Sequence, residues 1–173
     1  NRARPRTVGR VRDADGRMAT LPPMVDGTLL AIDSATELLC LAACGPAGER
    51  CLVQPGGAEA SARLITSARE LLEAVGARWD TLDAVAFGKG PGAFTGLRTA
   101  CAVAQGLSLG TSRPVIAVDS LLLVAEAAWP APDTVSAGSV AVVVDARMGE
   151  VYAARYARTA AGWSTVEPPR LAS

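Results

Sequence analysis

Hydrophobic and polar positions alternate in short blocks over the first third of the chain, and these blocks have the lengths of β-strands. Apolar runs cover residues 27–36, 38–44 and 50–53, and turns that contain glycine or proline separate them. The clearest of these turns is Gly45-Pro46-Ala47-Gly48. Short apolar runs between such turns predict a three-stranded meander.

The block that follows has helical spacing. Its apolar residues recur at intervals of three and four positions, which places them on one face of a helix over 61–75. Ser61 is the expected N-cap, and Gly76 is expected to end the helix. The residues of this apolar face are Leu64, Ala68, Leu71, Leu72 and Val75.

Strand-like and helix-like blocks then alternate along the rest of the chain. The whole order is βββ-α-β-α-β-α-β-β-β, which predicts an α/β fold with a mixed sheet flanked by helices. The further elements are strands over 82–87, 114–118, 139–145, 151–156 and 163–166, and helices over 94–109 and 121–129.

The composition excludes several classes of function. Among the 173 residues, 17 basic side chains balance 17 acidic ones, so the chain lacks the overall charge of an autonomous nucleic-acid binder. It contains no histidine, which excludes Ser-His-Asp and Cys-His catalysis and histidine-ligated metal sites. The four cysteines form no C-x-x-C pair and are expected to be free thiols. No apolar stretch approaches the roughly 20 residues of a membrane-spanning helix.

The two ends differ from the body of the chain. Residues 1–26 carry six arginines and show no apolar periodicity, so we expect a disordered basic leader, with an RNA-contacting tail as the alternative. The last residues follow Pro168-Pro169 without a closing helix. We therefore expect that the sequence is truncated at its C-terminal end.

The first candidate site is the turn Asp33-Ser34-Ala35-Thr36, where the first strand ends. A carboxylate and two hydroxyls at such a turn can bind a metal ion or phosphate oxygens. The same residues are also typical of a plain turn with Asx-type hydrogen bonds. Both interpretations stay open.

The second candidate is the glycine-rich segment from Gly88 to Arg98, between a strand and a helix. Glycine lets a backbone approach a phosphate or another backbone closely, and a helix N-terminus offers unpaired N–H groups. The spacing fits neither a Walker A loop nor a G-x-G-x-x-G fingerprint. The alternative is a tight turn that lets the next, small-faced helix pack closely. That helix carries Ala100, Cys101, Ala102, Ala104 and Gly106, and with the 61–75 helix it forms a face that covers the sheet or binds a partner.

Several ordered motifs resemble one family. The segments LLAIDSAT, LDAVAFGKGPGAFTGLRTACAVAQGLSLG, PVIAVDSL and VVVDARMGEVYAARY, between Gly27 and Trp163, are similar to those of the TsaB (YeaZ) family. The most specific parts are GxGPGxFTGLR and DARxGEVY. The resemblance implies the actin-like ATPase/ribonuclease H-like fold with a βββαβα core. It implies an N-terminal lobe over 27–118 and, over 119–173, the incomplete start of a second lobe that extends past the end of this chain.

The resemblance also implies a function. TsaB-like proteins are regarded as non-catalytic partners of TsaD. With the ATPase TsaE, the complex transfers threonylcarbamoyl from threonylcarbamoyl-adenylate to N6 of adenosine 37 in tRNAs that read ANN codons. We therefore expect a cytoplasmic scaffold subunit without activity of its own, which binds TsaD, pairs with itself when TsaD is absent, and reaches TsaE and tRNA only through the complex. It requires no metal or cofactor; ATP or ADP at the partner interface is the alternative.

Residue roles are carried over by the same resemblance. Asp33, Thr36, Gly90 and Gly92 correspond to a degenerate phosphate loop, and Gly96 shapes the turn into the helix. The expected partner interface lies on the two helices, where Thr95 caps the second helix and Arg98 bridges to the partner or to a phosphate. Charged replacements of Leu71 and Leu72 are expected to abolish TsaD binding without unfolding the domain. The interface residues are Leu64, Ala68, Leu71, Leu72, Thr95, Arg98, Cys101 and Ala102.

The DARxGEVY motif is represented by Asp145, Arg147 and Glu150. An ion pair between Arg147 and Glu150 across the turn is the simplest role for the last two.

Two other functions are weighed against the scaffold role. A small ATP-dependent phosphotransferase of the actin-like fold would use Asp33 with magnesium and the glycine loop on ATP, and would need Asp119 or Asp145 as a second acidic group. A peptidase is the least favoured, because the chain lacks both histidine and a recognisable serine–lysine pair. ATP hydrolysis by the purified chain alone separates the phosphotransferase from the scaffold.

Overall fold

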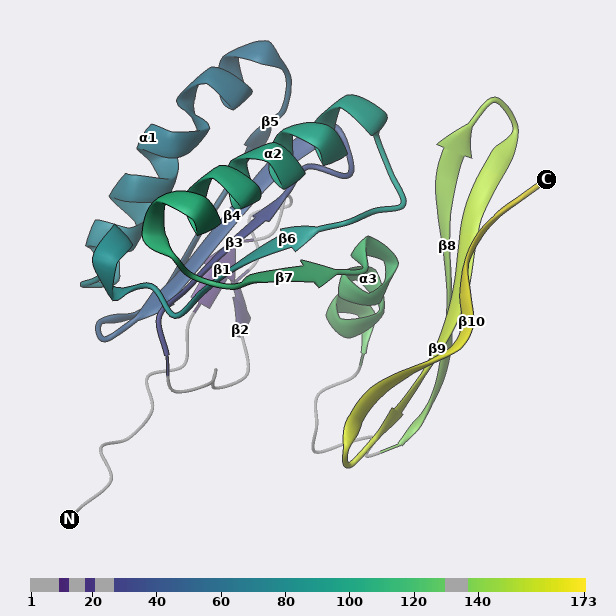
Figure 1. The fold of residues 1–173 in the computed structure, drawn as a ribbon. Coiled ribbons are helices and arrows are strands. Elements are labelled where there is room, and N and C mark those ends of the chain that lie inside the picture. Colours follow the sequence, from purple (N-terminus) through teal and green to yellow (C-terminus); the bar gives the residue numbers. More distant parts are fainter. Residues whose placement is uncertain (1–9, 13–17, 21–26, 130–136) are drawn as a thin grey trace. The chain divides into compact units, whose positions relative to one another are not determined.

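The chain forms two compact units (Figure 1). The first comprises the residues up to Gly88 together with Ala93–Ala117, and the second comprises Lys89–Gly92 and Val118–Ser173. The glycine-rich segment is thereby divided between the units, which its sequence does not indicate. The computed structural model describes residues 10–12, 18–20, 27–129 and 137–173.

Two short strands pair inside the segment that the sequence analysis treats as a leader. Strand β1 (Arg10–Arg12) and strand β2 (Met18–Thr20) run antiparallel, with Val11 opposite Ala19. The rest of the expected disordered leader lies outside the described residues.

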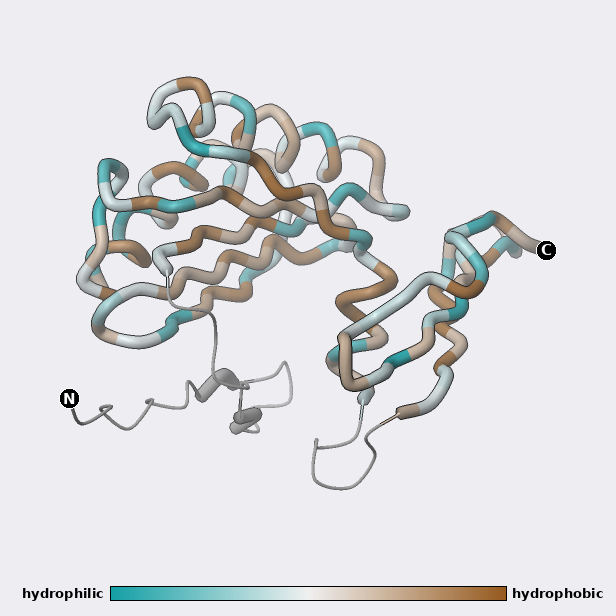
Figure 2. The backbone as a smooth tube through the Cα atoms, turned by 60° about the horizontal axis from the view of Figure 1, so that its bottom comes forward, coloured by the Kyte–Doolittle hydropathy of each residue, from teal (hydrophilic) through white to brown (hydrophobic). Residues whose placement is uncertain are grey.

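The first unit is built on a five-stranded sheet of β3 (Leu29–Asp33), β4 (Leu38–Gly45), β5 (Gly48–Pro55), β6 (Ala84–Gly88) and β7 (Val115–Val118). The strand order is β5-β4-β3-β6-β7. Strands β3, β4 and β5 form an antiparallel meander, whereas β6 runs parallel to β3. The predicted meander and mixed sheet are confirmed. Figure 2 shows that hydrophobic residues are frequent along these strands, and burial of such residues stabilises the sheet.

Two helices, α1 (Ala58–Ala74) and α2 (Phe94–Thr111), cover one face of this sheet (Figure 1). Helix α1 contacts β4 and β5, and helix α2 contacts β6 and β3. Full burial of one large apolar side chain stabilises the fold by about 1.5–3 kcal/mol. The centre of the core consists of Leu30, Ile32 and Leu41 from the sheet, Leu64 and Leu72 from α1, and Ala100 and Ala104 from α2.

The ends of α1 differ in part from the prediction. The helix begins three residues early, with Gly57 at the N-cap, and the Ser61 hydroxyl donates a hydrogen bond to the Gly57 carbonyl at 2.9 Å. The prediction of Ser61 as the N-cap is therefore wrong, because its side chain bonds backward inside the first turn. The C-terminal prediction is confirmed: Gly76 has a φ of 71° and donates to the Glu73 carbonyl at 3.0 Å.

The second unit combines helix α3 (Ser120–Ala128) with an antiparallel sheet of β8 (Gly138–Arg147), β9 (Glu150–Thr159) and β10 (Gly162–Ala172). The strand order is β10-β9-β8, as the predicted succession of three strands requires. Strand β10 continues through Pro168-Pro169, where its register against β9 shifts. The helix packs on one face, and the core there consists of Leu121, Ala125, Val142, Ala154 and Tyr156.

Asp119 joins the start of α3 to the sheet. One of its carboxylate oxygens accepts a hydrogen bond from the Leu121 backbone N–H at 2.9 Å, which makes Asp119 the N-cap of the helix. The other accepts from the Tyr156 hydroxyl at 2.8 Å. Tyr156 has no exposed surface, and burial together with the hydrogen bond to Asp119 raises the pKa of its hydroxyl. The phenol therefore stays protonated and remains the donor of this bond.

Replacing Asp119 with alanine is expected to destabilise the second unit by about 2–4 kcal/mol. The variant loses an N-cap, worth about 1 kcal/mol, and leaves a buried hydroxyl without an acceptor, which costs about 1–3 kcal/mol. Urea unfolding followed by tryptophan fluorescence in a Trp79→Phe background reports on Trp129 and Trp163, which both lie in this unit.

Adding Tyr156→Phe to Asp119→Ala is expected to restore part of the stability, because the unpaired hydroxyl is then gone. The wild type, the two single variants and the double variant form a double-mutant cycle. If their losses in the free energy of unfolding were strictly additive, the assigned hydrogen bond would be contradicted.

Candidate functional site

The Asp33–Thr36 turn is hydrogen-bonded to the start of α2. The Ser34 hydroxyl donates to the Gly96 carbonyl at 2.8 Å, and the Ala93 N–H donates to the Ala35 carbonyl at 2.6 Å. Within the turn, the Asp33 carboxylate accepts from the Ala35 N–H at 2.9 Å. The last of these is the hydrogen bond of an Asx-type turn, the alternative interpretation of this motif, whereas the first two join the turn to α2. The turn therefore serves to fix the position of α2.

Gly96 is the position at which α2 and this turn meet most closely. A Cβ atom built on Gly96 would lie 1.9 Å from the carbonyl oxygen of Ser34, so only glycine fits. Two backbones in contact exclude a phosphate from the same space. At Gly96, the glycine-rich segment therefore allows α2 to pack closely against the Asp33–Thr36 turn. Close packing of this helix was the alternative to phosphate binding in the sequence analysis.

The segment Lys89–Gly92 pairs with the residues around the start of α3. The Gly90 N–H donates to the Ser120 hydroxyl at 3.2 Å, and the Gly90 carbonyl accepts from the Ser120 N–H at 3.0 Å. The Lys89 N–H donates to the Val118 carbonyl at 2.8 Å. Both backbone groups of Gly90 are therefore occupied inside the second unit.

The four residues predicted to form a phosphate loop belong to different units. Asp33 and Thr36 lie in the first unit, whereas Gly90 and Gly92 lie in the second. The Thr36 hydroxyl accepts from the Leu38 N–H at 3.1 Å. Nucleotide binding by these residues stays a prediction.

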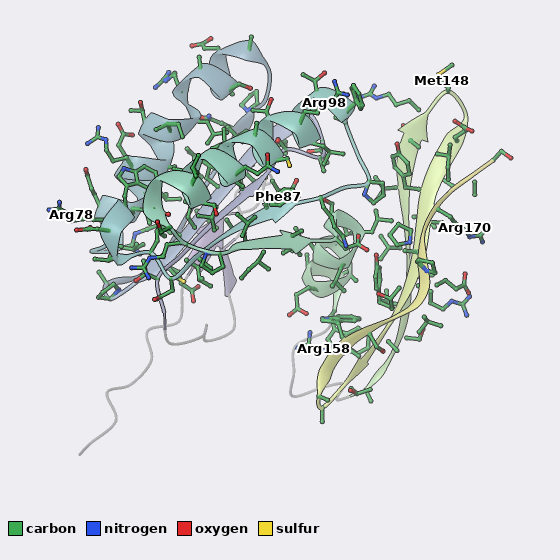
Figure 3. All side chains as sticks on the ribbon, in the orientation of Figure 1. Arg78, Phe87, Arg98, Met148, Arg158 and Arg170 are labelled. Carbon is green, nitrogen blue, oxygen red and sulfur yellow. The ribbon has the colours of Figure 1, made fainter. Side chains whose placement is uncertain are left out.

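The outer face of α2 exposes apolar and small residues. Phe94 is 67% exposed and Leu109 is 86% exposed. The Arg98 guanidinium lies over the Phe94 ring at 3.8 Å from its centroid, and Figure 3 labels Arg98. Of the expected interface residues, Thr95, Arg98 and Ala102 are exposed here and Cys101 is half-buried. Thr95 does not cap the helix, because Ala93 is the N-cap and no side chain accepts there.

The same face carries Gly106 and Gly110. A Cβ atom built on either residue would meet no described heavy atom within 4 Å. Unlike Gly96, these glycines are not required by the packing of the described part of the chain.

Helix α1 presents different residues from those expected. Leu64, Ala68 and Leu72 are at most 1% exposed and face the sheet. Their prediction as interface residues is corrected, because a side chain without accessible surface cannot contact a partner. Charging Leu72 would unfold the core rather than abolish binding alone, and Leu71 is half-buried against that core. Ile65 is a large apolar residue of α1 that is exposed, and its place off the helical stripe was the signal in the sequence that could have identified it.

The cysteines and carboxylates do not form a reactive centre in the described residues. All four cysteines are free, as expected, and burial raises the pKa of the Cys40, Cys44 and Cys51 thiols, which disfavours the nucleophilic thiolate. In 10–12, 18–20, 27–129 and 137–173, no three His, Cys, Asp or Glu side chains are grouped to hold a metal ion. Within the same residues, no helix has the length and hydrophobicity to span a membrane.

The DARxGEVY motif forms the hairpin turn between β8 and β9. The Asp145 carboxylate accepts from the Arg147 N–H at 2.8 Å, and Arg147 lies opposite Glu150 in the register. Arg147, Met148 and Gly149 all have positive φ, with values of 68°, 56° and 79°. The motif thus forms a tight hairpin turn that is stabilised by the hydrogen bond from the Arg147 N–H to the Asp145 carboxylate.

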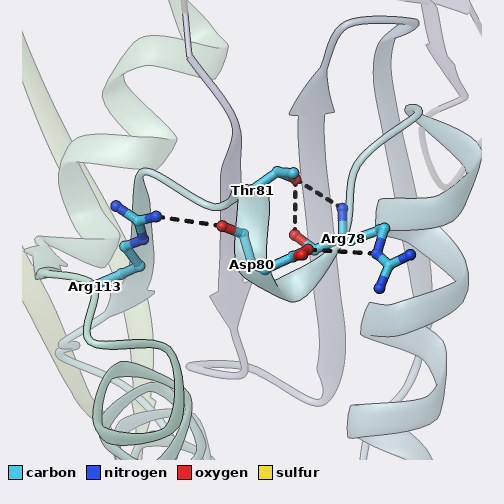
Figure 4. A network of polar contacts seen from close by, with 4 residues as sticks. All are labelled: Arg78, Asp80, Thr81 and Arg113. Carbon is cyan, nitrogen blue, oxygen red and sulfur yellow. Dashed lines mark hydrogen bonds and ion pairs between the residues drawn. The ribbon is translucent and has the colours of Figure 1, made fainter.

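A cavity of about 500 Å³ lies beside α1 and was not signalled by any sequence motif. The adjacent one-turn helix η1 (Trp79–Thr81) is fixed by the Thr81 hydroxyl, which accepts from the Arg78 N–H and donates to the Arg78 carbonyl, both at 2.9 Å (Figure 4). Arg113 donates to the Asp80 carbonyl at 3.3 Å. The cavity is lined by Leu72 and Trp79 and by the ion pairs Arg69–Glu73 and Arg78–Asp80.

Solved structures define the class of fold. YeaZ from Pseudomonas aeruginosa superposes with a TM-score of 0.73 at 35% identity, over 84% of this chain and 67% of that one. A second structure, an uncharacterized protein with similarity to peptidase YEAZ from Pseudomonas aeruginosa, superposes with a TM-score of 0.74 at 35% identity, over 84% and 66% of the two chains. The chain therefore has the actin-like ATPase/ribonuclease H-like fold, as the motifs predict.

Sequence comparisons define the family. Residues 54–169 match the family model "TsaD: tRNA N6-adenosine threonylcarbamoyltransferase". The tRNA threonylcarbamoyladenosine biosynthesis protein TsaB of Escherichia coli (strain K12) is 37% identical over 130 residues, 75% of this chain and 55% of that protein. The Haemophilus influenzae protein of the same name is 37% identical over 132 residues, which are 76% of this chain and 54% of that protein. The chain belongs to the TsaB/YeaZ group of the TsaD family, and it spans about half the length of these curated relatives.

Substitution by alanine is expected to have opposite effects on stability at two glycines of α2. Gly96→Ala pushes a methyl group into the Ser34 carbonyl and is expected to destabilise the first unit by at least about 2 kcal/mol. Gly106→Ala adds a methyl group in open space and is expected to stabilise it by about 0.5–1 kcal/mol. Thermal and urea unfolding of the two variants measure both changes, and equal effects at the two positions would contradict the contact.

Proposed function

We propose that this chain is the TsaB-type scaffold subunit of a cytoplasmic complex that adds threonylcarbamoyl to N6 of adenosine 37 in ANN-decoding tRNAs. In this proposal it binds a TsaD subunit, which carries the active site, and contacts TsaE and tRNA through that complex. The family and the named relatives support a role in this modification. The chain has no independent activity in the proposal.

The observation that carries the proposal is the outer face of α2. A glycine inside a helix destabilises it by about 0.5–1 kcal/mol relative to alanine, and nothing in the described chain requires glycine at position 106. The face also leaves Phe94 and Leu109 largely in water. Small residues between two exposed apolar ones suit the close approach of a partner helix. Thr95, Arg98 and Ala102 are also exposed on α2, and Ile65 is exposed on α1. In the proposal, Arg98 pairs with an acidic group of the partner.

The same surface suits self-association. In the absence of TsaD we expect two copies of the chain to pair through α1 and α2. ATP or ADP at the heterodimer interface belongs to the proposal as an option, with Asp33, Thr36, Gly90 and Gly92 as the residues concerned.

The phosphotransferase alternative is less well supported. It needs a second acidic group beside Asp33, and both candidates have hydrogen-bonded structural roles. Asp119 accepts from Leu121 and Tyr156, and Asp145 accepts from Arg147.

The purified chain is expected to hydrolyse no ATP above the rate of a Gly96→Ala control. Phosphate release that rises with protein concentration and is lost in Asp33→Asn would favour the phosphotransferase instead.

Gly106→Leu is expected to weaken TsaD binding at least about tenfold, because its side chain would occupy the space of the approaching helix. The fold should be retained, since the position is open in the chain itself. Isothermal titration calorimetry with the TsaD of the same organism measures the affinity, and light scattering gives the stoichiometry.

The matched control is Ala127→Leu, because Ala127 is also an exposed helical position, on α3. Equal affinities of the two leucine variants would place the interface elsewhere. A wild-type chain that forms no complex would contradict the scaffold role.

A further inference from the structure

The β5 edge of the five-stranded sheet is a feature that the proposed function does not use. Strand β5 is the last strand in the order of this sheet and pairs with β4 alone. Its other side therefore carries a row of backbone N–H and C=O groups over eight residues. An edge of this length is a template on which a strand of another molecule can pair, so folded proteins usually cover or charge such edges.

A segment that is distant in the sequence lies against this strand. Strand β1 contacts β5, and β1 is joined to β2 in an antiparallel pair. The hairpin of β1 and β2 is thereby the part of this chain that is placed to cover the β5 edge.

Glu49 of β5 has a carboxylate oxygen that needs a partner. Its Oε2 atom is buried, and no group of the described residues donates a hydrogen bond to it. Glu49 lies opposite Cys44, whose neighbour Ala43 packs in the core under α1, so strand alternation places Glu49 on the sheet face away from that helix. A buried carboxylate oxygen without a donor destabilises the fold, and pairing with a cation removes much of that cost.

The sheet around Glu49 offers no suitable cation. Strand β4 carries no charged residue. Arg50 is next to Glu49 in β5, and alternation places it on the opposite face, where it donates to the Glu49 carbonyl at 2.7 Å. The cation therefore has to come from the segment that contacts β5 from outside the sheet.

Strand β1 has the required charge. Two of its three residues, Arg10 and Arg12, are basic, and they share one face of the strand because they are two positions apart. Strand β2 carries no charge. The acidic residues of the hairpin, Asp13 and Asp15, belong to the loop between the two strands, outside the described residues. The strand that contacts β5 is thus purely basic and complements Glu49.

We propose that the hairpin of β1 and β2 is a strap over the β5 edge, held by an ion pair between Glu49 and the arginines of β1. The strap keeps other molecules away from this edge and from the half-buried thiol of Cys51, which is two positions after Glu49 and on the same face. The inference does not rest on the proposed function.

Thiol labelling measures whether the strap is in place. The full chain is treated with N-ethylmaleimide under non-denaturing conditions, and the tryptic peptides that begin at Cys51 and at Thr99 are quantified by mass spectrometry over time. The second peptide contains Cys101 of α2, which serves as the internal reference.

The double variant Arg10→Gln/Arg12→Gln is expected to raise the labelling rate of Cys51 several-fold and to leave that of Cys101 unchanged. The matched control is Arg2→Gln/Arg4→Gln, which removes the same charge outside β1 and is expected to label like the wild type. Equal rates for Cys51 in the two double variants would overturn the proposal, whether both were fast or both slow.

A charge exchange tests the ion pair itself. Glu49→Arg is expected to raise the labelling rate of Cys51 several-fold, and the further changes Arg10→Glu and Arg12→Glu are expected to restore the rate of the wild type, because opposite charges then face each other again. Absence of rescue in a protein that unfolds at the wild-type temperature would overturn the ion pair. If Glu49→Arg does not fold, the Arg10→Gln/Arg12→Gln variant decides alone, because it leaves the sheet unchanged.

Discussion

Helix α2 rests on the β3–β4 turn at a distance that only a glycine permits, and the first unit depends on this contact. The Ser34 carbonyl occupies the space beside Gly96, while the Ser34 hydroxyl and the Ala93 N–H complete two hydrogen bonds between turn and helix. Because α2 covers both β3 and β6, this contact sets the depth at which the helix lies on the sheet. The backbones of Ser34 and Gly96 are therefore used in the contact between the turn and the helix.

Small residues on α2 serve two purposes on opposite faces. Ala100 and Ala104 lie against the sheet without exposed surface, which keeps the helix close to it. Ala102 and Gly106 lie exposed on the outer face, and no described atom near Gly106 requires a glycine there. The outer face of α2 therefore gains little stability from its own small side chains.

The second unit shows how acidic residues that suggest catalysis can be structural. Asp119 caps α3 and accepts the hydroxyl of a fully buried tyrosine, and Asp145 braces a turn of three residues with positive φ. Each carboxylate lies where a strand ends, which is also where active sites of α/β proteins are found. Strand-end position alone therefore does not distinguish a catalytic carboxylate from a cap.

Much of the architecture was predictable from the sequence, because it depends on local periodicity. The short apolar runs between turns predict the strands, and the helical spacing over 61–75 with Gly76 at its end predicts the first long helix. The order of the elements then restricts the topology to a mixed sheet with helices, and the spacing of the motifs identifies the family.

The tertiary structure alone decided which apolar residues are core and which are surface. Leu64, Ala68 and Leu72 match an interface stripe as well as a core stripe, and only the position of the sheet assigns them to the core. The roles of Gly96 and Gly106 likewise differ only through what lies beside them. The sequence gives the type of each side chain and its position in the chain. Whether that side chain is buried depends on residues that are distant in the sequence and that lie beside it only in the folded protein.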